Sequence, residues 1–171
     1  MMTDPIRNGA WDGPVLERAR YFLKDTVRQE VDFSTSDQNQ GVPAPPVEKP
    51  CPPDAERVSL PPREAWAHVA AVDITVAIGQ RTSCRRYAPD ALHMDELSLL
   101  LWATQGIRKN LGHGTALRTV PSAGARHALE TYLCILNVDS LEPGIYRYLP
   151  VEHELVRVSF VPDLSERITA A

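Results

Sequence analysis

The stretch that decides the fold is TYLCILNVDSLEPGIYRYLPVEHELVRVSF, residues 131–160. It opens with a dense run of aromatic, aliphatic and β-branched side chains at 131–138, and turn-forming residues follow at 139–144. Residues 145–149 and 154–160 then alternate between apolar and polar side chains across a short intervening turn. This pattern predicts a strand followed by an antiparallel hairpin.

Helical periodicity dominates the chain before this stretch. Apolar residues recur at three- and four-residue steps in residues 14–30 and again in residues 63–80, where Asp73 is a candidate N-cap that would divide the segment in two. Residues 95–105 predict a further helix, and Gly106 stands where a left-handed C-terminal cap would end it. Helices combined with a hairpin-built sheet predict an α+β fold, an antiparallel sheet flanked by helices.

A proline-rich segment, residues 34–62, separates the first predicted helix from the rest. Proline has no backbone N–H and restricts the residue before it to extended conformations, so we expect an extended arm and not a core element. We divide the chain into an N-terminal helix and proline-rich arm, 1–62, and a partial α+β domain, 63–171. The prolines of the arm are Pro43, Pro45, Pro46, Pro50, Pro52, Pro53, Pro61 and Pro62.

The composition is that of an ordinary globular protein. The chain has 171 residues, of which 43% are hydrophobic and 23% are charged, and this suits one domain with an apolar core. The formal net charge is −4, so the molecule as a whole has no basic field that would attract a polyanion. We therefore expect no binding to nucleic acid.

The cysteines and the terminal segment indicate the compartment. Cys51, Cys84 and Cys134 lack the spacing of metal ligands, and their odd number argues against a disulfide framework, so we expect reduced thiols and no metal site. Residues 1–13 contain no apolar stretch of the roughly 7 to 15 residues that an export signal needs. The sequence also has no run of about 18 apolar residues. These features predict a cytoplasmic protein that does not insert into a membrane.

Residues 81–86, RTSCRR, carry three arginines and two hydroxyl side chains in an otherwise mildly acidic chain. Guanidinium groups match phosphate oxygens in a bidentate geometry, and hydroxyl groups and loop amides can complete such a site. The segment therefore predicts a binding site for a phosphomonoester. The alternative is a solvated basic face with weak surface ion pairs, which is what most short arginine clusters form.

Residues 118–127, RTVPSAGARH, form a second candidate binding segment. The small residues Ser122, Ala123 and Gly124 allow the backbone to approach a flat ligand closely. Pro121 fixes the direction of the chain, and the Ser122 hydroxyl can form one hydrogen bond. A tight loop that leads into a strand is an equally good interpretation of the composition alone.

Five sequence blocks stand in order between residues 81 and 148: RTSCRRY (81–87), ELSLLLWATQG (96–106), RTVPSAGARH (118–127), ETYL (130–133) and PGIYRY (143–148). In this order they resemble the N-terminal half of the nitroreductase-like flavoproteins, and specifically the SagB-type dehydrogenase branch. Five ordered blocks are more specific than any one of them. The motif SDQ at 36–38 and the proline-rich arm also resemble the N-terminal extension of that branch.

The resemblance implies an α+β fold whose homodimer interface holds two FMN molecules. NAD(P)H, or a small-molecule or peptide substrate, would stack on the exposed face of the flavin. The FMN phosphate and ribityl chain would be contacted by Arg81, Thr82, Ser83 and Arg85. The isoalloxazine ring, mainly that of the flavin held by the other subunit, would be lined by Pro121, Ser122, Ala123 and Gly124. Further candidates are Gln105 and Arg126.

No side chain is assigned to the chemical step, because a flavin itself accepts and returns the hydride while the protein orients it. Cys84 has no histidine partner at a diagnostic spacing, and most lone cysteines are small buried residues that fill space. We interpret His127 as a structural histidine rather than a substrate contact.

Members of this family continue beyond the point that corresponds to Ala171, so the resemblance implies that the C-terminal half of the fold is missing from this sequence. We therefore expect the 171-residue chain to retain FMN weakly or not at all.

Two functions remain open at this point. One is an FMN-dependent oxidoreductase, which would reduce nitroaromatics or quinones or would oxidise a peptide azoline. The other is a truncated, catalytically silent scaffold or dimerisation subunit of the same fold.

Overall fold

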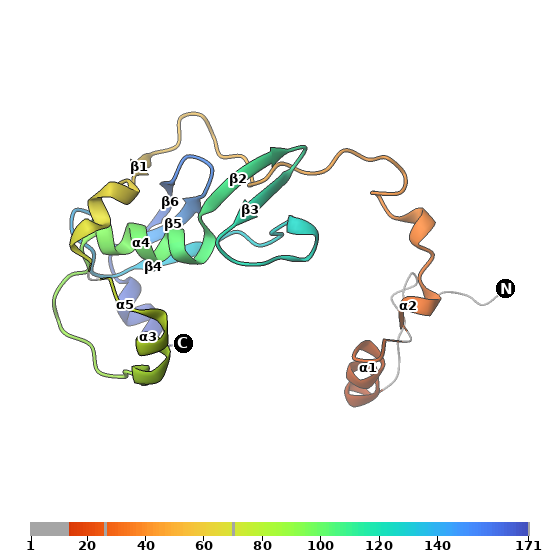
Figure 1. The fold of residues 1–171 in the computed structure, drawn as a ribbon, viewed down its shortest axis with the longest axis horizontal. Helices are drawn as coiled ribbons and strands as arrows, with labels where there is room; N and C mark the ends of the chain where they lie inside the picture. The colour runs from red at the N-terminus through yellow and green to blue at the C-terminus, as the bar shows by residue number, and fades with distance from the viewer. Residues whose placement is uncertain (1–13, 26, 70, 171) are drawn as a thin grey trace. The chain divides into compact units, whose positions relative to one another are not determined.

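The computed structural model describes residues 14–25, 27–69 and 71–170 (Figure 1). The chain divides into two compact units, residues 1–44 and 45–171. Both candidate binding segments belong to the second unit.

In its described residues, 14–25 and 27–44, the first unit contains three short helices: α1 (Val15–Phe22), α2 (Val27–Glu30) and the 3-10 helix η1 (Phe33–Thr35). The single helix predicted over residues 14–30 is thus divided into two. Leu16 and Phe22 of the apolar stripe are exposed, and no residue of α1 is buried.

A four-stranded antiparallel sheet forms the centre of the second unit, in the order β1–β6–β5–β4. The strands are β1 (Arg57–Ser59), β4 (Tyr132–Ile135), β5 (Gly144–Leu149) and β6 (Glu154–Phe160). The predicted strand and hairpin are confirmed, with Tyr148 opposite Leu155 where β5 and β6 pair. The α+β prediction is therefore confirmed.

Strand β1 comes from the proline-rich arm. The expectation that the arm contributes no core element is wrong for its last part, because β1 pairs with β6 and the next residue, Leu60, is only 7% exposed. Residues 57–60 contain no proline, so their N–H groups are available for pairing, and an edge strand tolerates prolines beside it.

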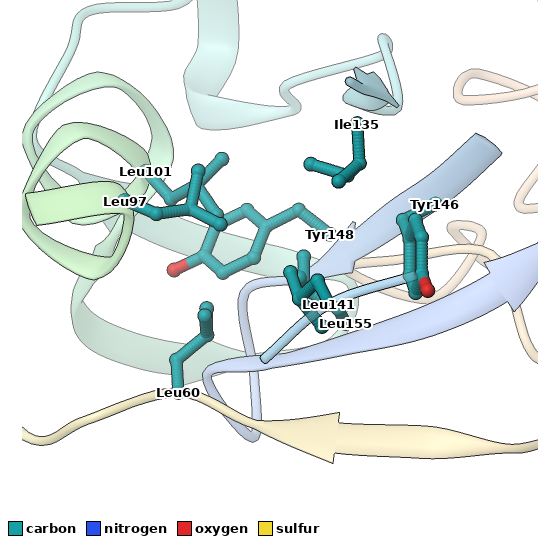
Figure 2. Close-up of a cluster of buried hydrophobic side chains, with 8 residues drawn as sticks. All are labelled: Leu60, Leu97, Leu101, Ile135, Leu141, Tyr146, Tyr148 and Leu155. Carbon is teal, nitrogen blue, oxygen red and sulfur yellow. The ribbon is translucent and has the colours of Figure 1, made fainter. Parts of the chain in front are cut away.

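Helix α4 (Met94–Gln105) covers one face of the sheet through Leu97 and Leu101 (Figures 1 and 2). In Figure 2 the ring of Tyr148 lies between these leucines and Leu60. Burial of a large apolar side chain contributes about 1.5–3 kcal/mol, so this layer supplies much of the stability of the unit. The remaining members of the buried cluster are Ile135, Leu141, Tyr146 and Leu155.

Gly106 ends α4 as predicted, but in a different conformation. The predicted left-handed cap is wrong, because Gly106 has φ −60° and ψ 141°. A Cβ at this position would lie 2.4 Å from Cδ1 of Trp102 and 2.6 Å from its carbonyl oxygen. The chain therefore requires glycine here for close packing and not for a positive φ.

The other elements connect or flank these layers. The predicted break near Asp73 is confirmed, since it separates the 3-10 helix η2 (Arg63–His68) from α3 (Ile74–Gln80). A hairpin of β2 (Ile107–Gly112) and β3 (Thr115–Arg118) follows α4 and was not predicted. The 3-10 helix η3 (Ala123–Ala125) and helix α5 (Leu164–Thr169) complete the unit.

Candidate functional site

The basic segment predicted to bind phosphate begins where α3 ends. The Asp73 carboxylate accepts a hydrogen bond from the Thr75 N–H at 2.8 Å and so starts α3, and the chain leaves the helical region at Arg81, with φ −57° and ψ 122°. Residues 81–88 have no regular secondary structure and are all exposed. The hydroxyl of Tyr87 donates to the Cys84 carbonyl at 3.2 Å.

The side chains of Arg81, Thr82, Ser83 and Arg85 form no hydrogen bond or ion pair with any residue that the structure describes. Their donors therefore face solvent. Such a group of guanidinium and hydroxyl donors fits a phosphate better than it fits the protein interior, where each donor would need a partner.

The second predicted segment is a strained loop after β3. Gly124, Ala125 and His127 have φ angles of 63°, 53° and 47°. A left-handed conformation costs a residue with a Cβ on the order of 1–3 kcal/mol, and such strain is concentrated at binding and catalytic sites. Ser122 holds the loop together, because its Oγ accepts from the His127 N–H at 3.0 Å and its carbonyl from the Ala125 N–H at 3.1 Å.

Within one chain the two segments do not meet. Figure 1 shows α3 and the chain after it on the side where α4 begins, whereas η3 lies beyond the end of α4, next to β3. No hydrogen bond or ion pair joins residues 81–85 to residues 121–124 in the part of the chain that the structure describes. The eight predicted residues thus form two separate surfaces.

The two further FMN-binding candidates, Gln105 and Arg126, have different surroundings. Gln105 is held by the protein, since its Oε1 accepts from Nη1 of Arg118 at 3.2 Å, and Arg126 is exposed beside the strained loop.

Two buried arginines fasten the proline-rich arm. Nη2 of Arg118 donates to the Val47 carbonyl at 3.0 Å, and Nη2 of Arg147 donates to the Pro50 carbonyl at 3.4 Å. Glu130 accepts from the Lys49 N–H at 2.6 Å. Burial lowers the pKa of Arg118, and the carboxylates nearby partly offset this effect. The arm has few N–H groups, so it is held largely through its carbonyls.

A buried polar network was missed by the sequence analysis. Oγ of Ser98, which is fully buried, donates to the Pro61 carbonyl at 2.6 Å, accepts from Nε1 of Trp66 at 3.1 Å and lies 2.8 Å from Nε2 of His153. Nδ1 of His153 lies 2.8 Å from the hydroxyl of Tyr148. These partners are up to 55 positions apart in the sequence, so no local motif reveals them.

The network is structural. Ser98 donates its only proton to a carbonyl, so His153 is assigned as the Nε2–H tautomer, with Nδ1 accepting from Tyr148. Burial lowers the pKa of His153 and raises the pKa of Tyr148 to about 12, so both stay neutral near pH 7. The Ser98 hydroxyl is inaccessible, and these residues do not form a nucleophilic site.

Other kinds of site find no support within the described residues. No group of three or more His, Cys, Asp or Glu side chains is arranged to hold a metal ion there. The three cysteines are free thiols. No helix of the described part is both long and apolar enough to cross a membrane.

Comparison with known proteins gives consistent matches. The sequence model of the Nitroreductase family matches residues 78–169. A protein of Methanocaldococcus jannaschii that is named as a nitroreductase is 39% identical over 79 residues, which are 46% of this chain and 38% of that protein. A crystal structure from Ralstonia eutropha JMP134, also named as a nitroreductase, has 28% sequence identity and a TM-score of 0.49, and the match covers 71% of this chain and 54% of that one. The chain thus spans 38% and 54% of the lengths of these two proteins.

Proposed function

The chain belongs to the nitroreductase family, and we propose from this that it is a subunit of an FMN-dependent oxidoreductase. The observation that carries the proposal is the exposed group of side-chain donors on Arg81, Thr82, Ser83 and Arg85. These residues lie inside the region matched by the family, and their side chains have no partner among the described residues.

The residues present fit FMN at both ends of the cofactor. Arg81 and Arg85 would hold the phosphate, and Thr82 and Ser83 would donate to the phosphate or the ribityl chain. Residues 121–124 would line the isoalloxazine ring, because Gly124 and its neighbours present backbone without large side chains. The chemistry that FMN supplies when bound is the acceptance and return of a hydride, from NAD(P)H or from an organic substrate.

We also propose that the active protein is a homodimer. The two predicted segments are separate in one chain, so a flavin contacted by both would have to receive them from different subunits. The apolar surface of α3 supports this proposal, since Ile74 and Ile78 are 71% and 72% exposed.

Within the family, we propose the SagB-type dehydrogenase branch, with a small molecule or a peptide as substrate. The five ordered blocks and the proline-rich arm support this narrower assignment.

A flavin titration tests the proposal. FMN is added to the purified chain, and binding is followed by the quenching of flavin fluorescence, which detects even weak complexes. The double variant Arg81→Ala, Ser83→Ala should weaken binding by about tenfold or more, since a charge-assisted hydrogen bond contributes about 1.5–3 kcal/mol. The matched control, Arg108→Ala, removes an exposed arginine of β2 and should leave binding unchanged.

If the wild type and the double variant bind FMN with equal affinity, Arg81 and Ser83 do not bind the phosphate. No quenching by the wild type at about 1 mM FMN would leave the catalytically silent scaffold as the better function for this chain.

A further inference from the structure

We propose that a cavity between the proline-rich arm and the sheet binds a small organic carboxylate. The cavity has a volume of about 280 Å³, near the lower end of the usual range for ligand sites, roughly 300–1,000 Å³. None of its lining residues belongs to the segments assigned to FMN, so the proposal is independent of the flavin.

The sheet forms the floor of the cavity and the arm forms its roof. Tyr132, Arg147 and Val156 are direct cross-strand partners on β4, β5 and β6, so their side chains share one face. Alternation along the strands places this face opposite the one that packs on α4. The roof consists of residues 49–52 and Ala55.

The lining is cationic. Lys49, Arg147 and Arg157 all line the cavity, and no aspartate or glutamate among the described residues does. Two carboxylates lie just outside it: Oε2 of Glu130 is 3.9 Å from Nη1 of Arg147, and Oε1 of Glu56 is 3.2 Å from Nη2 of Arg157. The Arg157 guanidinium lies toward the opposite face of the sheet, because Arg157 pairs with Tyr146 across the strands, its Nε donates to the Tyr146 hydroxyl at 3.3 Å and Glu56 neutralises its charge. Lys49 and Arg147 thus face one carboxylate, Glu130, and this balance favours a monoanion.

Arg147 is the residue that a carboxylate would satisfy. Its side chain is only 5% exposed, and its Nη1 is buried without a hydrogen-bond partner among the described residues. Its one hydrogen bond to the described part of the chain, from Nη2 to the Pro50 carbonyl, is long at 3.4 Å. A buried guanidinium with an unused donor is costly, and carboxylate oxygens match its geometry.

The rest of the lining selects an organic acid over inorganic phosphate. Pro50, Pro52, Val156 and Val158 present aliphatic surface, and Tyr132 presents an aromatic ring. A ligand with a carboxylate at one end and a short apolar or aromatic body would contact both the cationic and the apolar surface of the cavity. Inorganic phosphate would leave the apolar walls in contact with water.

Cys51 provides a measure of occupancy because it is a lining residue of the cavity, with Nη2 of Arg57 donating to its Sγ at 3.0 Å. Cys84 and Cys134 are exposed and lie outside the cavity, so they serve as internal references. The reduced chain is alkylated with iodoacetamide, with benzoate as the probe ligand, and the rate at each cysteine is followed by peptide mass spectrometry.

For a Kd on the order of 1 mM, about 10 mM benzoate should slow the alkylation of Cys51 roughly tenfold and leave the other two rates unchanged. An unchanged Cys51 rate would overturn the proposal. Equal protection by inorganic phosphate would overturn the choice of an organic carboxylate.

A pair of charge reversals tests the cationic lining. Lys49→Glu places a negative charge in the cavity and should abolish the protection by benzoate. Lys109→Glu makes the same change of charge on the exposed strand β2, outside the cavity, and should preserve the protection. Loss of protection in both variants, or in neither, would contradict a site built around these cations.

Discussion

Nε2 of His153 lies 2.8 Å from Oγ of Ser98, and this contact completes a chain of hydrogen bonds from Trp66 to Tyr148 through the interior. Ser98→Ala would leave the N–H groups of Trp66 and His153 without their acceptor. Each unsatisfied buried donor costs about 1–3 kcal/mol, so we expect the free energy of unfolding to fall by about 2–4 kcal/mol in urea titrations.

The matched control for that change is Ser159→Ala, which removes a hydroxyl from an exposed position of β6 and should shift the free energy of unfolding by less than about 0.5 kcal/mol. A similar small shift for Ser98→Ala would show that the network contributes little to stability.

The same network predicts a pH dependence. Burial holds the pKa of His153 below its usual 6.5, so in the window just below pH 6.5 the unfolded chain binds more protons than the folded chain. The contribution of neutral His153 is therefore complete above about pH 6.5 and is lost as the pH falls through the lowered pKa. We expect the wild type to lose its stability advantage over His153→Gln on acidification from about pH 7.5 to pH 5.

His93 and His127 titrate in both the wild type and His153→Gln. The difference in unfolding free energy between these two proteins therefore cancels the contributions of His93 and His127. A difference in unfolding free energy that stays constant across this pH range would contradict the assignment of a neutral, buried His153.

Two glycines should respond in opposite ways to alanine. Gly106→Ala forces a Cβ to within 2.4 Å of the Trp102 ring and should lower the free energy of unfolding by about 1–3 kcal/mol. Gly79→Ala, inside α3, meets nothing within 4 Å and should raise it by up to about 1 kcal/mol, because alanine favours the helix. Thermal unfolding of both variants would check the pair, and equal effects would refute the packing explanation.

The strained loop gives a further pair of substitutions. Ala125→Gly should stabilise the fold by about 1 kcal/mol, because its φ of 53° suits glycine, and Gly124→Ala, at a φ of 63°, should destabilise it by about 1–2 kcal/mol. Chemical unfolding measures both. If neither variant departs from the wild type, the left-handed conformations are not maintained in solution.

The sequence predicted the parts of the fold that depend on local patterns. Alternation in residues 145–149 and 154–160 predicted the hairpin, and the carboxylate of Asp73 predicted the start of α3. The hairpin of β2 and β3 was missed because its residues are mostly polar and exposed, and its turn uses three successive left-handed residues, Gly112 to Gly114, instead of a common two-residue signal.

Features that depend on tertiary contacts could not be predicted. The arm was expected to stay outside the core, yet Leu60 is buried because β6 offers an edge that the sequence of the arm does not reveal. Likewise, Gly106 was placed correctly at the end of α4 but explained wrongly, since the reason for glycine is the ring of Trp102. The role in binding FMN stays a prediction for Arg81, Thr82, Ser83 and Arg85 and for residues 121–124.

Arg118 and Arg147 hold the arm by its backbone carbonyls at Val47 and Pro50. Every amino acid supplies a carbonyl, so positions 47 and 50 can accept other side chains and still be held. The two arginines have no such freedom, because only a long side chain with several donors reaches those oxygens. Under random mutagenesis with selection for folding, we therefore expect substitutions to accumulate at these arm positions and to be rejected at the two arginines.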